Sequence, residues 1–371
     1  MPDKLLNSLR SNSKDFWDTT PSLRTSKGAK FSEKGLFLFL CLLLIFATFS
    51  IAGTEISVGF AFLFFILKKI LERPGWRRII PQTGLNLPIF CFLAACLVSS
   101  IISIEPKRSF YALIAKTLEY GAIYFLFIES IGVSRKRFNI ILILLFASCG
   151  LSAVNGLFQQ FHGVDFLRQR PLVHGWLTAG FKYYNDFGGY LILVLPLILG
   201  AFFCKKIKLS IRSFVILPLA ILAGLCLALT YSRGAWVGFV AGFIFLFIYI
   251  LIYLANSKQR IYLPILVIAV CALIIFVTPP AMKERVTSIF QMESVGRLGK
   301  NGLWMQAISL FRHRVFFGQG LGIYMNIASG TYAHNCYLQM LAEIGIVGLL
   351  SFFWIIGRLF KSGIRSFKES R

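Results

Sequence analysis

The chain has 371 residues, and 57% of them are hydrophobic, a larger share than soluble domains usually carry. Its formal net charge of +24 would by itself suggest a nucleic-acid partner. The Lys and Arg residues instead fall in short clusters between long apolar runs, which is the charge pattern of a protein that crosses a membrane several times. We therefore exclude nucleic-acid binding and expect an integral membrane protein.

The first 34 residues are polar and basic, and the first apolar run follows them directly. A cleavable signal has a shorter charged region and a small-residue cleavage site, so we expect an uncleaved anchor instead. Residues 1–34 are predicted to be a disordered cytoplasmic tail. Residues 35–371 are predicted to form a single transmembrane domain.

Ten apolar runs approach the length of about 20 residues that a membrane-spanning helix needs. A tight turn at Gly53-Thr54-Glu55 is expected to join the first two. The predicted fold is all-α, a polytopic integral membrane protein with about 10 transmembrane helices, at most about 12. The runs are residues 35–53, 56–71, 86–104, 110–130, 138–157, 186–204, 211–230, 235–254, 261–278 and 335–357.

Lys and Arg are concentrated in alternate loops, which predicts the orientation. With the N-terminus inside, the inside segments hold most of the 39 basic residues, so both termini are expected in the cytoplasm. Two long loops, residues 158–185 and 279–333, then face outward. The second is expected to contain helices, including an amphipathic one at 303–314 whose apolar stripe would lie on the bilayer surface.

The sequence offers little for metal or thiol chemistry. The eight cysteines lie within or at the ends of apolar runs and form no C-x-x-C pair. The outward carboxylates are scattered, and there is no Asp-x-Asp, P-loop or paired-carboxylate glycosidase signature. We expect no metal and no cofactor, so a transferase would have to stabilise a diphosphate leaving group with Arg and Lys.

The stretch 332–348 begins with a polar pair, His334-Asn335, at the edge of the last apolar run. Histidine titrates near neutral pH, so an imidazole here could accept a proton from a sugar hydroxyl or orient that hydroxyl. The alternative is a packed, hydrogen-bonded histidine. Tyr332 and Asn335 are predicted to contact substrate.

The loop before this stretch is basic and predicts an anionic, phosphorylated, lipid-bound substrate. Its candidate substrate-binding cations are Arg285, Arg297 and Lys300. Arg297 could also be a solvated charge, and Lys300 competes with it for the same role. His162, His174 and His313 are weaker candidates in the outward loops.

Several charged residues lie within or between apolar runs. Arg233 is either a headgroup anchor or a phosphate ligand, because a guanidinium stays charged and donates in a fork. Lys116 and Glu119 lie three residues apart in a span and could face each other, as a structural or a functional pair. Glu343 could orient a neighbour or face a cavity, and Gly345 would permit close helix packing.

Four motifs in order carry a family resemblance. His334-Asn335 is followed after nine residues by Gly345-Ile-Val-Gly348, and Ser232-Arg233 lies in Thr-Tyr-Ser-Arg-Gly-Ala-Trp. Arg297 precedes Trp304 and Phe-Phe-Gly-Gln-Gly, and residues 180–196 contain Tyr-Asn-Asp at the start of a span. Over about residues 150–357 the chain resembles the bacterial O-antigen ligase and O-antigen polymerase superfamily.

The resemblance implies a metal-independent, inverting glycosyltransferase of the bacterial inner membrane. Such ligases move a glycan from undecaprenyl diphosphate to lipid A–core on the periplasmic face. By motif, Arg233 and Arg297 would hold the diphosphate and His334 would activate or orient the acceptor hydroxyl. Arg297 lies seven residues before Trp304, a wider gap than the family pattern, so Lys300 could take its place.

Other functions remain open from the sequence. An O-antigen polymerase and a protein-directed O-oligosaccharyltransferase share the donor and differ in the acceptor. From other classes, a transporter or flippase would show broken spans in matching halves and charges at mid-membrane. A non-catalytic scaffold is the last alternative.

Overall fold

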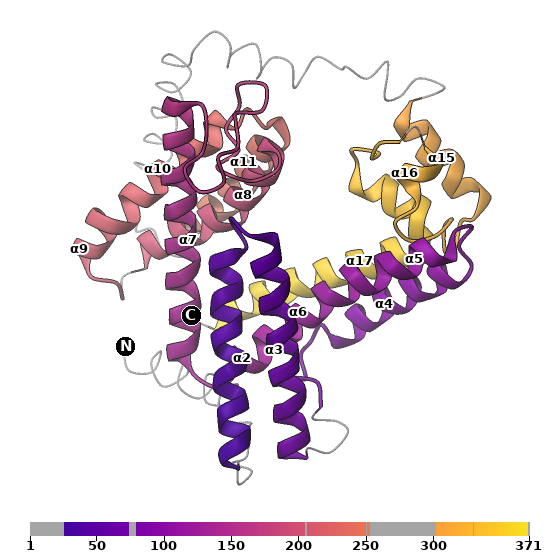
Figure 1. Ribbon diagram of the computed structural model, residues 1–371, viewed down its shortest axis with the longest axis horizontal. Helices are drawn as coiled ribbons and strands as arrows, with labels where there is room; N and C mark the ends of the chain where they lie inside the picture. Colours follow the sequence, from indigo (N-terminus) through magenta and orange to yellow (C-terminus); the bar gives the residue numbers. More distant parts are fainter. Residues whose placement is uncertain are drawn as a thin grey trace. The chain divides into compact units, whose positions relative to one another are not determined.

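The computed structural model describes residues 26–73, 79–204, 206–249, 251–252, 302–328 and 330–369. The regular elements among these residues are all helices (Figure 1). In chain order they are α2 (Lys27–Phe46), α3 (Ile51–Glu72), α4 (Asn86–Ile101), α5 (Pro106–Ala112), η2 (Leu113–Leu118), α6 (Glu119–Ile131), α7 (Arg135–His162), α8 (Tyr184–Phe203), α9 (Leu209–Ile211), η3 (Arg212–Ile216), α10 (Leu217–Leu229), α11 (Arg233–Tyr249), α15 (Leu303–His313), α16 (Tyr324–Ile327) and α17 (Cys336–Glu369).

The described helices confirm the all-α, membrane-protein prediction. Six of them are long and apolar enough to cross a membrane. The shorter helices Asn86–Ile101 and Arg233–Phe245 are also apolar. Residues 261–278 lie outside the described residues. The total of about ten spans and the periplasmic side of the long loop therefore stay predictions.

The predicted turn between the first two apolar runs is wrong. The helices are separated at residues 47–50, and Gly53, Thr54 and Glu55 lie inside α3. Ser50 caps that helix, because its hydroxyl accepts a hydrogen bond from the Gly53 N–H at 3.0 Å. Gly53 therefore lies in the first turn of α3, and the chain does not reverse direction at this residue.

The first described helix also begins earlier than predicted. α2 starts at Lys27, so the last residues of the predicted disordered tail are helical. Glu33 in this turn pairs with Arg137 at 2.8 Å. The ion pair with Arg137 of α7 helps to order this polar start of α2.

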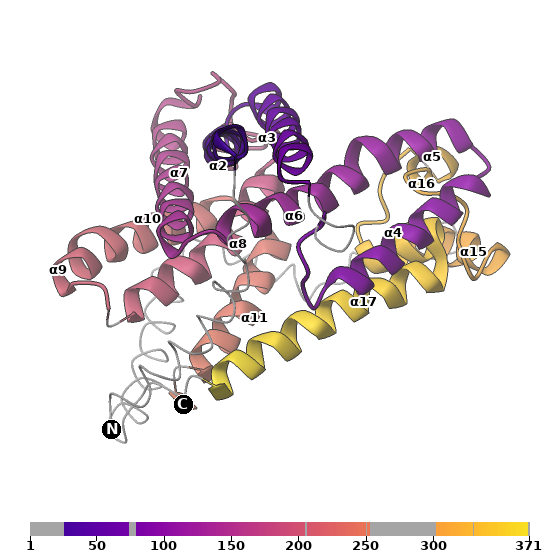
Figure 2. The ribbon, with the colours of Figure 1, turned by 90° about the horizontal axis from the view of Figure 1, so that it is seen from below.

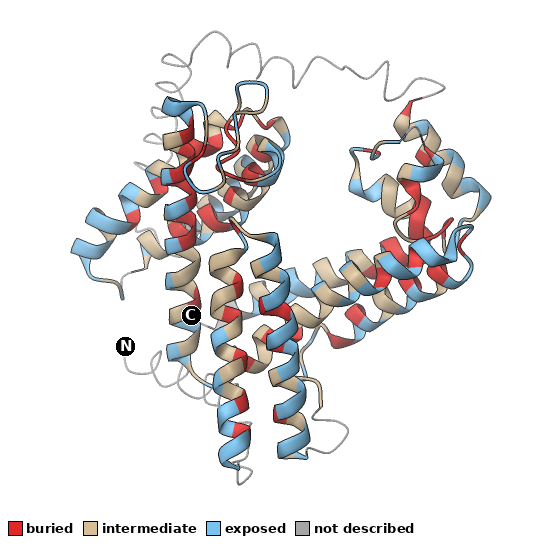
Figure 3. Cartoon of the chain, viewed as in Figure 1, coloured by how far each residue is buried: buried red, intermediate tan, exposed pale blue. Residues whose placement is uncertain are grey.

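The described residues fall into two compact units. Unit 1 lies within Met1–Leu40, Val58–Phe138 and Glu293–Arg371, and unit 2 within Cys41–Ser57 and Asn139–Met292. In unit 1, α4 runs beside the first part of α17 in both views (Figures 1 and 2). Buried residues gather around the first part of α17, which packs against both α4 and α15 (Figure 3). The single transmembrane domain over residues 35–371 stays a prediction.

Unit 1 also contains a half-buried network of ion pairs. The Lys68 amine lies 2.7 Å from the Glu129 carboxylate and 3.8 Å from both Glu33 and Glu72. Lys69 lies 2.9 Å from the same oxygen of Glu129. Because the Lys68 side chain is only 7% exposed, it is the centre of the network and the residue most costly to lose.

Replacing Lys68 with Met should destabilise the protein by about 3 kcal/mol, because it leaves buried carboxylates without their central cation. The apparent midpoint of thermal unfolding in detergent measures the effect. Lys136→Met is the matched control, since that lysine is exposed. Equal midpoints for Lys68→Met and wild type would show that the network contributes nothing.

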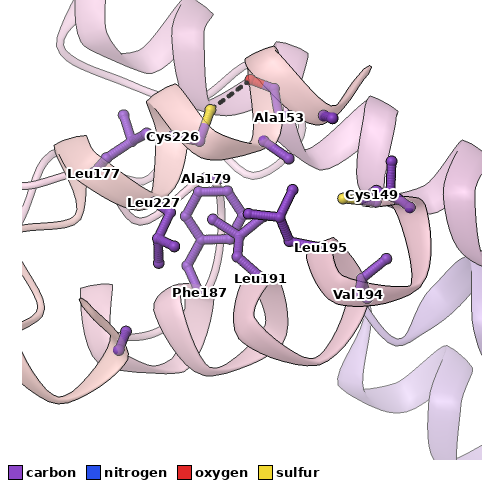
Figure 4. Close-up of a cluster of buried hydrophobic side chains, with 14 of the residues drawn as sticks. Cys149, Ala153, Leu177, Ala179, Phe187, Leu191, Val194, Leu195, Cys226 and Leu227 are labelled. Atoms are coloured by element: carbon purple, nitrogen blue, oxygen red, sulfur yellow. Dashed lines mark hydrogen bonds between the residues drawn. The ribbon is translucent and has the colours of Figure 1, made fainter. Parts of the chain in front are cut away.

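Unit 2 has an apolar core between α7, α8 and α10. Phe187, Leu191 and Leu195 of α8 pack against Cys226 of α10 (Figure 4). The Cys226 thiol donates to the Ala153 carbonyl of α7 at 3.3 Å. This small residue acts as a packing element, as predicted for the cysteines.

The predicted outward loop of unit 2, residues 158–185, is built on buried polar side chains. The fully buried Asp165 carboxylate accepts backbone N–H bonds from Leu167, Arg168 and Arg170 at 2.7–3.0 Å. The Asn155 side chain of α7 also donates to Asp165, at 3.2 Å. Asp165 therefore shapes the loop that leads into α8.

Candidate functional site

The last long helix, α17, is interrupted at Gly345. This residue has φ 66° and ψ −169°, so it leaves the helical conformation in the middle of an apolar segment. The segment 315–320 fills the interruption. The Ile346 and Val347 N–H groups donate to the carbonyls of Val315 and Phe316, at 2.9 and 3.2 Å. The freed backbone groups of a candidate membrane helix are thereby satisfied by protein.

Bonds also run in the other direction across the interruption. The Gln319 N–H donates to the Ala342 carbonyl at 2.9 Å, and the Gly320 N–H donates to the Glu343 carbonyl at 3.0 Å. A Cβ on Gly345 would lie 2.3 Å from the Phe316 oxygen, and one on Gly318 would lie 2.4 Å from the Glu343 backbone. Both positions require glycine because two backbones meet there.

Glu343 organises the loop that faces this interruption. Its buried carboxylate accepts N–H bonds from Gly322 at 2.9 Å and Tyr324 at 3.2 Å, and from the Gln339 amide at 3.1 Å. Burial and the nearby Glu343 raise the pKa of Tyr324, whose hydroxyl donates to the Leu303 carbonyl at 2.6 Å. Glu343 therefore positions the polypeptide from Gly322 to Tyr324.

A cavity of about 730 Å³ opens next to Glu343, within unit 1. This volume lies in the range of small-molecule sites. One wall comes from α5, η2 and the start of α6, and the other from residues 321–343. Its polar and charged lining consists of Lys107, Arg108, Tyr111, Lys116, Thr117, Tyr120, Tyr332, Gln339 and Glu343.

Three predicted site residues lie beside one another where α17 begins. Tyr332 lines the cavity. His334 is exposed and has φ 52°, a left-handed backbone conformation. Asn335 caps α17, since its side-chain oxygen accepts the N–H groups of Tyr337 and Leu338 at 3.1 and 3.2 Å. The cap explains the Asn in the His-Asn pair without substrate contact.

The predicted amphipathic helix is present as α15, but part of its apolar stripe faces inward. Ala307 is fully buried in a cluster with Tyr324 and Ala333. The Trp304 indole donates to the Ala333 carbonyl at 3.0 Å. Ala307 is therefore not available to lie on a bilayer surface, and the helix supports the loop that leads to His334.

Arg233 lies in unit 2, as the half-buried first residue of α11. The preceding Ser232 hydroxyl donates to the Asn185 side chain of α8 at 2.7 Å. Thus the structure joins the Ser-Arg motif to the Tyr-Asn-Asp motif. A cation is disfavoured at a helix N-terminus by the helix dipole, so helix formation does not explain an arginine there.

Aromatic rings surround this motif in unit 2. Trp176 contacts Tyr184 edge to face, with ring centroids 4.5 Å apart, and stacks with Tyr231 at 6.2 Å. Tyr231 also lies 6.2 Å from Trp236. Faces of this kind can hold sugar rings as well as a guanidinium.

Arg285, Arg297 and Lys300 lie outside the described residues, so their roles stay predictions. The expected Lys116–Glu119 pair is absent from the ion pairs of the described residues. Lys116 lies in the π-helix η2, and Glu119 is the first residue of α6. Lys116 instead lines the cavity.

Sequence reasoning missed several cavity residues. Lys107 and Arg108 were not among the predicted site residues, although two adjacent cations between apolar runs are a usable signal. Glu343 was predicted to orient a neighbour or face a cavity, and it does both. Among the described residues, no three His, Cys, Asp or Glu side chains are grouped to hold a metal ion, and metal independence stays a prediction.

These features define a helical membrane protein with a cation-lined cavity beside a broken helix. Residues 218–353 match the family model described as O-antigen ligase. This segment includes Arg233 and His334, and its match supports the predicted resemblance to the O-antigen ligase and polymerase superfamily. The family acts in membranes on lipid-linked glycans. No curated protein and no solved structure gives a significant match.

Proposed function

We propose that this protein is an inverting O-antigen ligase, which moves a glycan from undecaprenyl diphosphate to lipid A–core on the periplasmic face of the bacterial inner membrane. The observation that carries the proposal is the family match over residues 218–353, which spans both Arg233 and the His334–Gly348 motif. The cation-lined cavity next to this motif supports an anionic substrate.

The proposed reaction is a direct displacement at the anomeric carbon. The acceptor hydroxyl attacks this carbon from one face, its proton passes to His334, and a new glycosidic bond forms. The bond from the anomeric carbon to the diphosphate oxygen breaks, and the diphosphate leaves with the bonding electrons. Arg233 and Arg297, or Lys300 in place of Arg297, stabilise the negative charge that develops on it.

A polymerase and a protein-directed transferase would use the same donor with another acceptor. Cells of the source bacterium that lack the protein separate these functions. Loss of a ligase leaves lipid A–core unmodified while long glycan accumulates on the carrier, which is the expected result. Lipid A–core capped with single units would indicate a polymerase, and unchanged lipopolysaccharide would contradict both.

A further inference from the structure

The cavity of unit 1 has more positive charge than its own carboxylate can balance. Lys107, Arg108 and Lys116 line it, and Glu343 is its single lining carboxylate among the described residues. The ion pairs of the described residues include none of these three cations. Three cations around one hollow repel one another unless an anion enters it.

Glu343 does not serve as that anion. Its oxygens accept the Gly322 and Tyr324 N–H groups and the Gln339 amide, as described above. It acts on Lys116 electrostatically but makes no ion pair with it within 4.0 Å. The carboxylate therefore holds the wall of the cavity, and the cations remain available to a ligand.

The remaining lining suits the sugar part of a ligand. Tyr111, Tyr120 and Tyr332 provide aromatic faces and hydroxyl groups, and Gln339 adds an amide. Tyrosine packs its apolar ring against a ligand while its hydroxyl hydrogen-bonds, which fits the mixed surface of a sugar. The cavity volume of about 730 Å³ is large enough for a headgroup of this kind.

We propose that this cavity binds the phosphorylated headgroup of a glycolipid, with its phosphate on Lys107, Arg108 and Lys116 and its sugar on the tyrosines. The site is additional to Arg233, Arg297 and His334. Two lipids carry this chemistry, the diphosphate-linked donor and a phosphorylated lipid A acceptor. The identification of the ligand as one of these two lipids rests on the proposed function. The proposal that the cavity binds an anion does not depend on it.

Binding to the purified full-length protein in detergent tests the site. The probes are farnesyl diphosphate, its phosphate-free counterpart farnesol, lipid A, and inorganic pyrophosphate. The variants are Lys107→Gln/Arg108→Gln and Lys116→Met. The matched control is Arg135→Gln/Lys136→Gln, an adjacent pair of exposed cations at the start of α7 in the same unit.

Wild type and the control should bind a phosphate-bearing probe equally, and more weakly as salt increases. Each cavity variant should bind it at least about tenfold more weakly, because a charge-assisted hydrogen bond is lost. Tighter binding of farnesyl diphosphate than of farnesol shows that the diphosphate is recognised. Tighter binding of farnesyl diphosphate than of lipid A identifies the donor as the ligand, and the reverse order identifies the acceptor. Pyrophosphate bound as tightly as lipid A, the probe that carries both phosphate and sugar, would show a phosphate site without a sugar contact and would overturn the headgroup proposal.

Equal affinity of wild type and both cavity variants for all probes would overturn the site. Lys107 and Arg108 are exposed, so the double variant should keep the wild-type unfolding midpoint. Lys116→Met is the second test at an independent position. Since no glycan is transferred in this experiment, loss of binding in the variants would stand even if the protein proved not to be a ligase.

Discussion

Gly345→Val is expected to destabilise the protein by about 3–5 kcal/mol, the largest stability effect of any single change considered. The residue has φ 66°, which a β-branched side chain rarely adopts, and its Cβ would lie 2.3 Å from the Phe316 oxygen. Neither backbone can move away without breaking the bonds from Ile346 and Val347. The apparent unfolding midpoint in detergent should fall by more than about 5 °C.

Gly357→Ala is the matched control on the same helix. A Cβ at this position would meet nothing within 4 Å. Alanine forms helices better than glycine, so the variant should be as stable as wild type or more stable by about 1 kcal/mol. A Gly345→Val protein with the wild-type midpoint would show that α17 is not interrupted in the way the structure describes.

Arg233→Ala is expected to lower glycan transfer at least about 100-fold, because it removes a donor from the charge that develops on the leaving diphosphate. Arg233→Lys should recover only part of the activity, since an ammonium cannot donate in the same two-pronged geometry. His334→Ala should lower transfer by a similar factor, through loss of the proton acceptor. Transfer in membranes that contain each variant is the measurement.

The amount of protein in the membrane and its unfolding midpoint should be unchanged in these variants. Lys206→Ala, at an exposed cation in the same unit as Arg233, should transfer at the wild-type rate. Full activity of Arg233→Ala and His334→Ala would remove both residues from the reaction. A fall in both activity and membrane level would instead assign them to folding.

Hydropathy predicted the existence of the helices well because a bilayer leaves the backbone few other choices. Each predicted run outside residues 261–278 overlaps a helix in its described residues, and the helix at 303–314 was predicted to within one residue. The break at Gly345 was not predicted. A glycine in an apolar run is more often a packing residue, and the break depends on a partner segment, residues 315–320, that is distant in sequence.

Residues of the candidate site could be predicted only where a single polar residue stood out in an apolar part of the sequence. His334 stood out as a polar residue at the edge of a span, and Arg233 as a cation between two spans. The cavity could not be inferred, because its two walls, residues 107–120 and 321–343, are far apart in the sequence. The role of Asn335 as a helix cap could have been predicted from the apolar run that follows it, and its contact with substrate stays a prediction.

Transfer by the purified protein tests the central proposal most directly. The protein would be supplied with undecaprenyl diphosphate-linked glycan and lipid A–core, with EDTA present to remove divalent ions. We expect glycan on lipid A–core, free undecaprenyl diphosphate, an inverted anomeric configuration, and no product with Arg233→Ala. Absence of transfer to lipid A–core by active, folded protein, together with extension of the carrier-linked glycan, would contradict the ligase proposal.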